Sequence, residues 1–525
     1  MSEDLLTAAQ MRAVEAAAIS SGAVSGAELM ERAGGFAAEA IRARPPGVEA
    51  GRRTALALCG PGANGGDGFV VARLLAERGW TVEARLLGDV AALTGDAAQA
   101  QRRWARIGRT LPLGSVDGPG DEPPALVIDA VFGTGLNRPL GDETMAALEA
   151  SLARFGGPEA LAGRVVAIDA PSGLCLDSGR LLCPRYFAGA AALTVTFHAA
   201  KLGHVLAEGP ETCGALAVGD IGLAPWRDAA AGRARLAAPG PAHLKRPGHK
   251  YSHGHALVLA GGVGRGGAAR LAARAALRAG AGLVTLCPPP AALIENAARL
   301  DAVMLRPVAD AAALTEALAD PRVSAVALGM GLGVGARARA LTAAALGSGR
   351  AVTLDADALT SFRDDPAALW AMTHPRTVLT PHMGEFAALF PDIADALRAP
   401  PRRGPAFSRV DAAARAAARA GCVVLLKGPD TAIATPDGAA VVSAAAYARA
   451  APWLATAGAG DVLAGVLVGL MARGWSAEVA AAEAAWLHVE AARAVGPGLI
   501  AEDLPDALPG VFARMAAPDF RSRAF

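Results

Sequence analysis

Short apolar runs alternate along this chain with longer stretches in which apolar residues recur at helical spacing. The apolar runs predict strands over 54–59, 82–87, 126–129, 165–169 and 193–197, and in the second half over 256–260, 323–328, 351–355, 376–379 and 422–427. Amphipathic or apolar stretches predict helices over 69–78 and 462–471, among others. Glycines stand at most junctions, which is typical of α/β proteins with a mainly parallel sheet.

The pattern breaks once, between residues 222 and 247, where Ala, Arg, Pro and Gly replace the regular alternation. A chain of 525 residues exceeds what one hydrophobic core usually organises. We therefore expect two domains, over 1–225 and 242–525, joined by a linker over 226–241.

Charge and composition exclude several classes of partner. The chain has 50 Lys and Arg against 49 Asp and Glu, so its balance indicates no nucleic-acid partner. The longest uncharged run, 279–294, contains three prolines and is too short to span a bilayer, and the acidic start has no signal-peptide pattern. Six cysteines without a C-x-x-C pair indicate neither zinc ribbons nor disulfides. We expect a cytoplasmic protein without membrane contact.

A glycine-rich stretch, GPGANGGDG, follows the first predicted strand at 60–68. Its G-x-G-x-x-G spacing is compatible with a dinucleotide-binding turn, and equally with an ordinary tight turn between a strand and a helix. Asp67 speaks against a pyrophosphate site, because a carboxylate repels phosphate where helix amides would bind it. Asn64 and Asp67 suit a cation or a substrate hydroxyl better.

Two more strand ends carry polar groups. Asp129 precedes FGTG, and Asp169 precedes APSG, which includes Ser172. One aspartate after a strand is more often a cap or turn former. Three such loops at one sheet edge favour a site in which Asn64, Asp129 and Ser172 surround a monovalent cation and Asp169 accepts a proton.

These motifs, with ELMERAG at 28–34, DAVFGTGL at 129–136 and KLG at 201–203, resemble the NAD(P)H-hydrate epimerase domain over about residues 10–222. The resemblance implies a Rossmann-like three-layer fold, a K⁺ ion held by Asn64, Asp129 and Ser172, and epimerisation of hydrated NADH and NADPH. It also implies that the substrate contacts Ala63, Asn64, Gly65, Gly66, Asp67, Gly133, Thr134, Gly135, Leu136, Asn137, Arg138, Pro139 and the catalytic Asp169. Ala63 departs from the family's usual asparagine.

The second half contains TAGAGD at 456–461, directly before an apolar helix. Amides of such a turn can stabilise a phosphoryl group in transfer, and Asp461 can take the proton of an attacking hydroxyl. A glycine-rich helix start with an aspartate cap is the simpler interpretation. Lys427 at a strand end, His382 with Glu385, and Asp355 with Asp357 strengthen the catalytic interpretation, although each has a plain structural role available.

This half resembles the ADP- or ATP-dependent NAD(P)H-hydrate dehydratase domain, which is ribokinase-like, over about residues 242–500. Further strings that carry the resemblance are LGMGLG at 328–333 and LDADAL at 354–359. The resemblance implies that Ala268, Gly331, His382 and the catalytic Asp461 contact the hydrate. It implies Mg²⁺ as a cofactor and a nucleotide, ADP or ATP, held by Lys427, Gly428, Pro429, Asp430, Thr431 and Gly460. Met330 and Tyr251 depart from the family's usual proline and glycine.

Four histidines lie between residues 243 and 255, but no Cys or carboxylate stands at matching zinc spacing, so we interpret them as incidental. The whole sequence thus predicts an α/β enzyme that repairs hydrated NADH and NADPH, acting as a homo-oligomer. The alternative is a small-alcohol kinase fused to a Rossmann-like domain that is non-catalytic or binds nicotinamide.

Overall fold

The computed structural model describes residues 3–43, 52–115, 122–230, 232, 234–238, 244–517 and 520. The chain forms two compact units. The first comprises residues 1–234 together with 400–408, and the second comprises 235–399 and 409–525.

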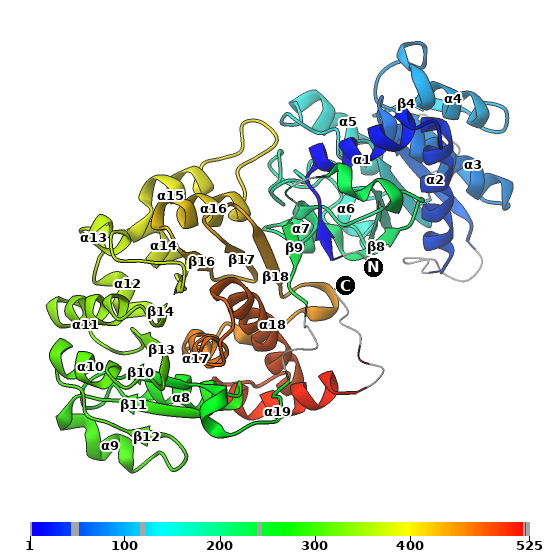
Figure 1. The fold of residues 1–525 in the computed structure, drawn as a ribbon. Coiled ribbons are helices and arrows are strands. Elements are labelled where there is room, and N and C mark those ends of the chain that lie inside the picture. Colours follow the sequence, from blue (N-terminus) through cyan, green and yellow to red (C-terminus); the bar gives the residue numbers. More distant parts are fainter. Residues whose placement is uncertain are drawn as a thin grey trace. The chain divides into compact units, whose positions relative to one another are not determined.

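The first unit is built on a parallel sheet with the strand order β4-β3-β2-β5-β6-β7-β8. Figure 1 draws most of this unit in blue, cyan and green and labels β4 and β8, the two edge strands. Its strands are β2 (Thr54–Cys59), β3 (Thr81–Leu86), β4 (Thr110–Pro112), β5 (Leu126–Ala130), β6 (Val165–Ile168), β7 (Leu193–Phe197) and β8 (Ala215–Gly219). A further short strand is β1 (Asp4–Leu5). The five predicted strands of this half fall on β2, β3, β5, β6 and β7, so the α/β prediction is confirmed.

Helices cover both faces of this sheet and complete three layers. The α-helices are α1 (Ala8–Ser20), α2 (Gly26–Ala43), α3 (Ala63–Glu77), α4 (Gly95–Trp104), α5 (Asp142–Ala153), α6 (Gly157–Ala160) and α7 (Gly209–Cys213). Short 3₁₀ helices are η1 (Val90–Ala92), η2 (Leu202–His204) and η3 (Ala224–Ala229). One core joins α2 and α3 to the sheet through residues such as Ile41 and Phe69, and another joins α5 through Leu148 and Leu152.

The glycine-rich stretch is helical where the sequence predicts a loop. Helix α3 begins at Ala63, six residues before its predicted start. Its glycines serve close packing, since a Cβ on Gly65 would lie 1.8 Å from the carbonyl oxygen of Gly60, and one on Gly68 would lie 2.6 Å from the Cβ of Ala130. Small residues therefore let the first turns of α3 lie directly against the end of β2.

The second unit has a mixed sheet with the order β9-β18-β17-β16-β15-β14-β13-β10-β11-β12, parallel except where β17 pairs with β16 and β18. Its strands are β9 (Ala234–Leu236), β10 (His255–Leu259), β11 (Leu283–Cys287), β12 (Met304–Leu305), β13 (Val323–Leu328), β14 (Ala351–Leu354), β15 (Thr377–Leu379), β16 (Val423–Leu426), β17 (Asp430–Ala434) and β18 (Ala440–Ala444). This arrangement confirms the predicted α/β class. Strand β9 lies inside the predicted linker 226–241, and Leu236 and Ala237 are buried.

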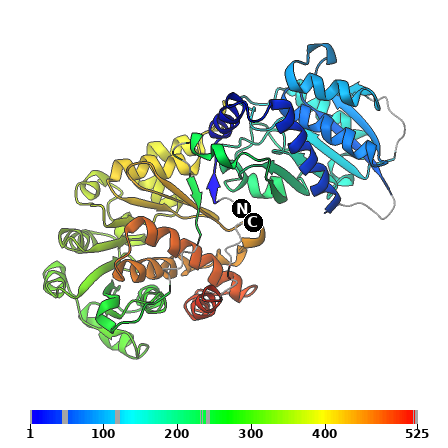
Figure 2. The same ribbon diagram turned by 45° about the vertical axis from the view of Figure 1, so that its right-hand side comes forward.

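Helices again cover both faces (Figure 2). The α-helices are α8 (Gly267–Arg278), α9 (Leu293–Ala297), α10 (Ala311–Leu318), α11 (Ala336–Gly347), α12 (Ala356–Thr360), α13 (Pro366–Trp370), α14 (Met383–Leu389), α15 (Pro391–Arg398), α16 (Arg409–Ala420), α17 (Ala459–Ala472), α18 (Ala477–Val495) and α19 (Asp503–Met515). The 3₁₀ helices are η5 (Lys250–His253), η6 (Pro290–Ala292), η7 (Tyr447–Arg449) and η8 (Pro452–Leu454). Helix α17 is buried along most of its length, because α8, α18 and the sheet enclose it.

Each sheet has one point from which successive strands of the chain are added in opposite directions. In the first, β2 lies between β3 and β5; in the second, β10 lies between β11 and β13. Loops that leave neighbouring strands in opposite directions open a crevice at the carboxyl edge, where α/β proteins bind ligands. The predicted site of the first unit falls at this point. In the second unit Ala268 and Gly331 do so, whereas His382 and Lys427 follow β15 and β16, farther along the same edge. Among the described residues, no helix is long and apolar enough to cross a membrane.

Candidate active sites

The first unit has a cavity of about 390 Å³ at the carboxyl ends of β2 and β5. Several predicted substrate residues line it, namely Ala63, Asn64, Asp67, Gly133, Thr134, Gly135 and Asp169. Met11, Arg12, Glu15 and Lys201 line it as well. The remaining predicted contacts, Gly65, Gly66, Leu136, Asn137, Arg138 and Pro139, lie outside this lining, and Gly65 and Gly66 are buried in the packing of α3.

Asp169 is the charged centre of this cavity. Its backbone is left-handed, with φ of 62°, a conformation that costs energy for a residue other than glycine. Lys201 Nζ and Thr196 Oγ1 donate to its Oδ1 at 3.0 and 2.9 Å, and the Thr134 amide donates to its Oδ2 at 2.8 Å. Burial works against ionisation, but Lys201 and these donors outweigh it and lower the pKa of Asp169. The carboxylate is therefore held ionised and oriented.

Lys201 and His204 hold Asp169 in position through hydrogen bonds to its carboxylate and its backbone carbonyl. Lys201 is 1% exposed and is one of only four lysines in the chain. Its backbone amide donates to His204 Nδ1 at 3.0 Å, so the proton of the neutral imidazole lies on Nε2, which is 2.8 Å from the Asp169 carbonyl oxygen. Burial lowers the pKa of His204 to about 4, which keeps the ring neutral. Neither role is predicted from the sequence, although the KLG motif at 201–203 and the rarity of lysine both mark Lys201.

Asp129 and Ser172 lie together behind the cavity. Asp129 is completely buried, and its carboxylate accepts from the Ser172 hydroxyl at 2.6 Å, the Ser172 amide at 2.7 Å and the Tyr186 hydroxyl at 2.8 Å. Burial raises the pKa of Asp129 despite these donors. Asn64 differs, because both polar atoms of its buried amide have no hydrogen-bond partner. An orphaned amide oxygen next to the cavity fits a cation ligand.

In the second unit, three neighbouring strands bring charged groups to one edge. Asp355 follows β14, Glu385 follows β15 and Lys427 follows β16. Lys427 Nζ lies 2.7 Å from Asp355 Oδ1 and 3.9 Å from Glu385 Oε2. Burial opposes the charge on Lys427, but these two carboxylates outweigh it and raise its pKa. Lys427 is thus a fixed cation rather than a solvated side chain.

Asp461 lies in the first turn of α17, two residues inside a helix that begins earlier than predicted. Gly458 precedes the helix with φ of 86°, and a Cβ on Gly460 would lie 3.4 Å from Lys427 Nζ, so the lysine reaches this turn. Burial, followed by the charge of Asp355, raises the pKa of Asp461 to about 6. A carboxylate tuned in this way beside free helix amides can accept a proton near neutral pH.

His382 forms the N-cap of α14. Its Nδ1 accepts from the amides of Gly384 and Glu385 at 2.9 and 3.3 Å, and Glu385 accepts in turn from the His382 amide at 2.8 Å. The structural interpretation of this pair therefore holds. The ring of His382 is 60% exposed, and its Nε2 lies 3.5 Å from Glu385 Oε1.

The predicted nucleotide residues form a hairpin between β16 and β17. Thr431 Oγ1 donates to the Gly428 carbonyl at 2.7 Å and accepts from the Gly428 amide at 3.2 Å, which closes the turn. Asp430 pairs with Arg409 at 2.9 Å, while Gly428 and Pro429 are exposed. The Lys427 amide donates to the Pro381 carbonyl at 2.9 Å, so the hairpin adjoins the His382 turn.

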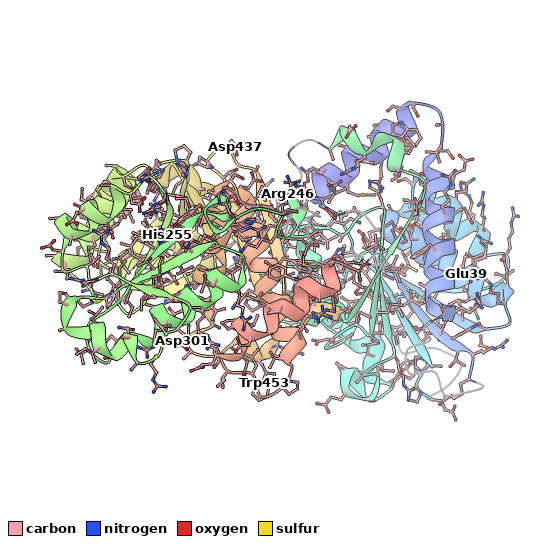
Figure 3. All side chains as sticks on the ribbon, turned by 60° about the horizontal axis from the view of Figure 1, so that its bottom comes forward. Glu39, Arg246, His255, Asp301, Asp437 and Trp453 are labelled. Atoms are coloured by element: carbon pink, nitrogen blue, oxygen red, sulfur yellow. The ribbon has the colours of Figure 1, made fainter. Side chains whose placement is uncertain are left out.

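Ala268 and Gly331 flank the reversal point of the second sheet. Ala268 is in the first turn of α8, after β10, and Gly331 follows β13 with φ of 66°. A Cβ on Gly331 would lie 2.6 Å from the Arg265 carbonyl oxygen, so a side chain is excluded there. The histidines between residues 243 and 255 form no metal site among the described residues. His255, labelled in Figure 3, bonds to Thr285 Oγ1 at 2.8 Å, and His243 lies outside the described residues.

The structure thus defines a protein of two α/β units, each with a cluster of partly or fully buried charged side chains at the ends of its strands. A family model described as NAD(P)H-hydrate dehydratase matches residues 256–507, and one described as YjeF-related protein N-terminus matches residues 26–203. The bifunctional NAD(P)H-hydrate repair enzyme of Moorella thermoacetica is 36% identical over 547 residues, covering 97% of both chains. The NAD(P)H-hydrate epimerase of Rhodobacter capsulatus is 46% identical over 206 residues, covering 38% of this chain and 91% of its own.

Among solved structures, the ADP/ATP-dependent NAD(P)H-hydrate dehydratase of Bacillus subtilis, co-crystallised with ATP and Mg²⁺, is 26% identical. It covers 52% of this chain and 95% of its own, with a TM-score of 0.43. The full-length relatives establish the identity: this chain belongs to the family of bifunctional NAD(P)H-hydrate repair enzymes, which join an epimerase to an ADP/ATP-dependent dehydratase.

Proposed function

We propose that the first unit interconverts the R and S hydrates of NADH and NADPH, with Asp169 as a proton acceptor, and that the second dehydrates the S form, with Asp461 as the base. The observation that carries this proposal is the pair of tuned carboxylates: Asp169 is held ionised by Lys201, and Asp461 is poised with a pKa of about 6 beside Lys427. A small-alcohol kinase fused to a silent domain is disfavoured, because bifunctional relatives match both halves.

The dehydration follows from the poor leaving ability of hydroxide. Asp461 takes the proton of the ring hydroxyl, and the hydroxyl oxygen attacks the terminal phosphoryl group of ADP or ATP, whose bond to the bridging oxygen breaks to release AMP or ADP. Phosphate then leaves with the electrons of the C–O bond, while the neighbouring carbon loses a proton and the ring double bond returns. Amides at the start of α17 stabilise the phosphoryl charge in transfer, and Lys427 contacts the nucleotide.

Lys427, Gly428, Pro429, Asp430, Thr431 and Gly460 are the proposed nucleotide residues, and Ala268, Gly331 and His382 the proposed hydrate contacts of this unit. Mg²⁺ bound to nucleotide phosphates commonly takes one or two protein carboxylates. Asp355 and Glu385, 2.7 and 3.9 Å from Lys427 Nζ, are placed to supply them and would neutralise phosphate charge through the metal.

In the first unit, K⁺ would be held by Asn64, Asp129 and Ser172. The unpartnered Asn64 amide fits this assignment. Asp129 and Ser172, which are hydrogen-bonded to each other, would supply the further oxygens. The ion would supply positive charge near the bound hydrate. We expect epimerisation to slow when K⁺ is exchanged for a large organic cation, and an unchanged rate after exhaustive exchange would remove the ion from the proposal.

The direct test incubates a mixture of hydrated NADH epimers with the full chain. Without nucleotide, the epimer ratio should relax to equilibrium; with ADP or ATP, both epimers should be consumed and the absorbance of reduced nucleotide should return. The same assays compare ADP with ATP. Recovery of only half of the absorbance would show that the first unit does not epimerise. Homo-oligomeric assembly and a cytoplasmic location stay predictions.

A further inference from the structure

Besides Asp67 and Asp169, the cavity of the first unit contains a third carboxylate, Glu15, which has no assigned role. It projects from α1, whose residues Met11 and Arg12 also line the cavity. The Arg12 guanidinium donates to the Thr134 carbonyl at 2.9 Å, which joins α1 to the loop after β5. Asp169 reaches the same cavity from the end of β6, so the two carboxylates approach it from different elements.

Among the described residues, Glu15 has neither a hydrogen-bond partner nor an ion pair. Of the other carboxylates that line the cavity, Asp67 shares this property and Asp169 does not. Asp129 is bound by Ser172 and Tyr186, and Asp169 by Lys201 and Thr134. Burial raises the pKa of Glu15, with Lys201 opposing and Asp169 adding to the shift. A half-buried, unpartnered carboxyl that faces a cavity can donate a proton as well as accept one.

Epimerisation of the hydrate requires two groups that can donate or accept a proton. The reduced nicotinamide ring is an enamine, so water adds its hydroxyl to the carbon beside the ring nitrogen and its proton to the next carbon. The product is a hemiaminal, whose C–O bond breaks when the hydroxyl is protonated and the nitrogen lone pair forms a C=N bond. Water then adds to the other face and loses a proton. One face requires an acid, and the opposite face requires a base.

We propose that Glu15 is the second proton-transfer residue of epimerisation and works with Asp169 on the opposite face of the ring. In one direction, Glu15 gives its proton to the departing hydroxyl, which leaves as water, and Asp169 takes a proton from the incoming water. The cycle moves one proton from Glu15 to Asp169, and exchange with solvent restores both groups. In the other direction the roles are reversed. This inference rests on the proposed function of the first unit.

The test compares the full chain with its Glu15→Gln, Glu15→Asp and Glu143→Gln variants. Glu143 on α5 is exposed and lies outside the cavity, so it controls for the loss of a carboxylate. Epimer exchange is followed by chromatography in H₂¹⁸O. We expect Glu15→Gln to lower kcat about 10²-fold or more with little change in KM, and Glu15→Asp to recover part of that loss. ADP-dependent dehydration by the same samples should stay at the parental rate, which shows that the second unit is intact, and thermal unfolding should show that the first unit of each variant is folded.

Uptake of ¹⁸O distinguishes the proposed roles of Glu15 and Asp169 from the proposed epimerase function of the first unit. In the parental enzyme, each epimerisation should incorporate one solvent oxygen, because the C–O bond breaks. Epimer exchange without ¹⁸O uptake would overturn the proposed roles, since ring opening at the C–N bond retains the oxygen. Parental kcat in Glu15→Gln would overturn the assignment of Glu15 alone. Failure of the parental enzyme to exchange epimers would instead overturn the proposed function of the first unit.

Discussion

Asp461 has two properties that suit a catalytic base. It lies in the first turn of a helix, and its pKa is close to the working pH. Burial and the carboxylates of Asp355 and Glu385 disfavour its ionised form, while Lys427 favours it, and its pKa is raised to about 6. A base works only when it is deprotonated. The rate of dehydration should therefore rise with pH up to about 6 and then level off.

The corresponding variant is Asp461→Asn, which keeps the size of the side chain and removes the base. Dehydration should fall about 10²-fold or more, with nucleotide KM little changed, and the limb near pH 6 should disappear from the pH profile. Lys427→Ala should instead raise nucleotide KM. Steady-state kinetics between pH 5 and 8 would measure both, and a near-parental rate in Asp461→Asn would refute the proposed base.

The buried pair of Asp169 and Lys201 gives a second prediction at this scale. Asp169→Asn should abolish epimer exchange and leave dehydration intact. It should also lower the free energy of unfolding of the first unit by about 3–5 kcal/mol, because the ammonium of Lys201 loses its counter-ion. The double variant Asp169→Asn/Lys201→Met should regain most of that stability without regaining activity. Denaturant unfolding and the epimer assay measure the two effects separately; equal stability of the single and double variants would contradict the argument.

At this scale, the sequence motifs predict which residues approach the sites, but not how those residues are held. Asp169, Asn64 and Asp67 line the cavity as their motifs indicate. The left-handed backbone of Asp169 and its bond to Lys201 depend on where β7 and the following turn lie, and these follow from tertiary packing. Glu15 is missed because a glutamate on an amphipathic helix has the same pattern as any solvent-facing residue.

Among the elements, α3 shows most clearly how glycine shapes a site. Its first turns lie so close to the end of β2 that the helix start and the cavity wall are the same segment. The sequence predicts a tight turn there and a helix only from residue 69, because glycines usually interrupt helices. Contact with the backbone of Gly60 instead selects the smallest side chain, and a pattern in one sequence cannot distinguish these two reasons for glycine.

Gly65→Ala tests this interpretation. The added methyl group would meet the Gly60 backbone, so α3 must shift, and we expect a loss of about 1–3 kcal/mol in the stability of the first unit together with slower epimerisation. Gly62→Ala is the matched control, because a Cβ there meets nothing within 4 Å. Thermal unfolding and the epimer assay on both variants provide the measurement. If the two variants behave alike, close packing is not the reason for Gly65.

The order of strands in the sheet also cannot be predicted from the local hydrophobic pattern. The sequence places Asp355, Glu385 and Lys427 at three separate strand ends, 30 and 42 residues apart. Their meeting depends on β14, β15 and β16 being neighbours in the sheet. Hydrophobic periodicity identifies strands, but crossover connections decide which of them pair.

For the whole molecule, the predicted linker suggests that the two halves work independently. Cleavage near residue 239, which lies outside the described residues, should give two fragments that each keep one activity, because the proposed catalytic residues of each unit lie on one side of the cut. The first fragment should bind its hydrate more weakly than the full chain. It lacks residues 400–408, whose Gly404 amide donates to the Asn137 carbonyl at 2.9 Å within the first unit.

Limited proteolysis followed by separation of the fragments provides the measurement, with the cleaved but unseparated protein as control. A first fragment with the KM of the full chain would contradict the role given to residues 400–408. Fragments that unfold on separation would contradict the domain boundaries.

Because the first unit includes residues 400–408, it can be completed only late in the synthesis of the chain. A ribosome makes the chain from its amino end, and a first domain usually folds as soon as it has emerged. Here the first unit stays incomplete until residue 408 has been made, about 170 residues after its main segment ends at Ala234. At about 5–20 residues per second, that interval is roughly 10–35 s. During it, Ala406's partners Cys175 and Leu182 lack the residue that covers them in the finished unit, so a nascent chain stalled before residue 400 should be more open to protease at this spot than the released protein.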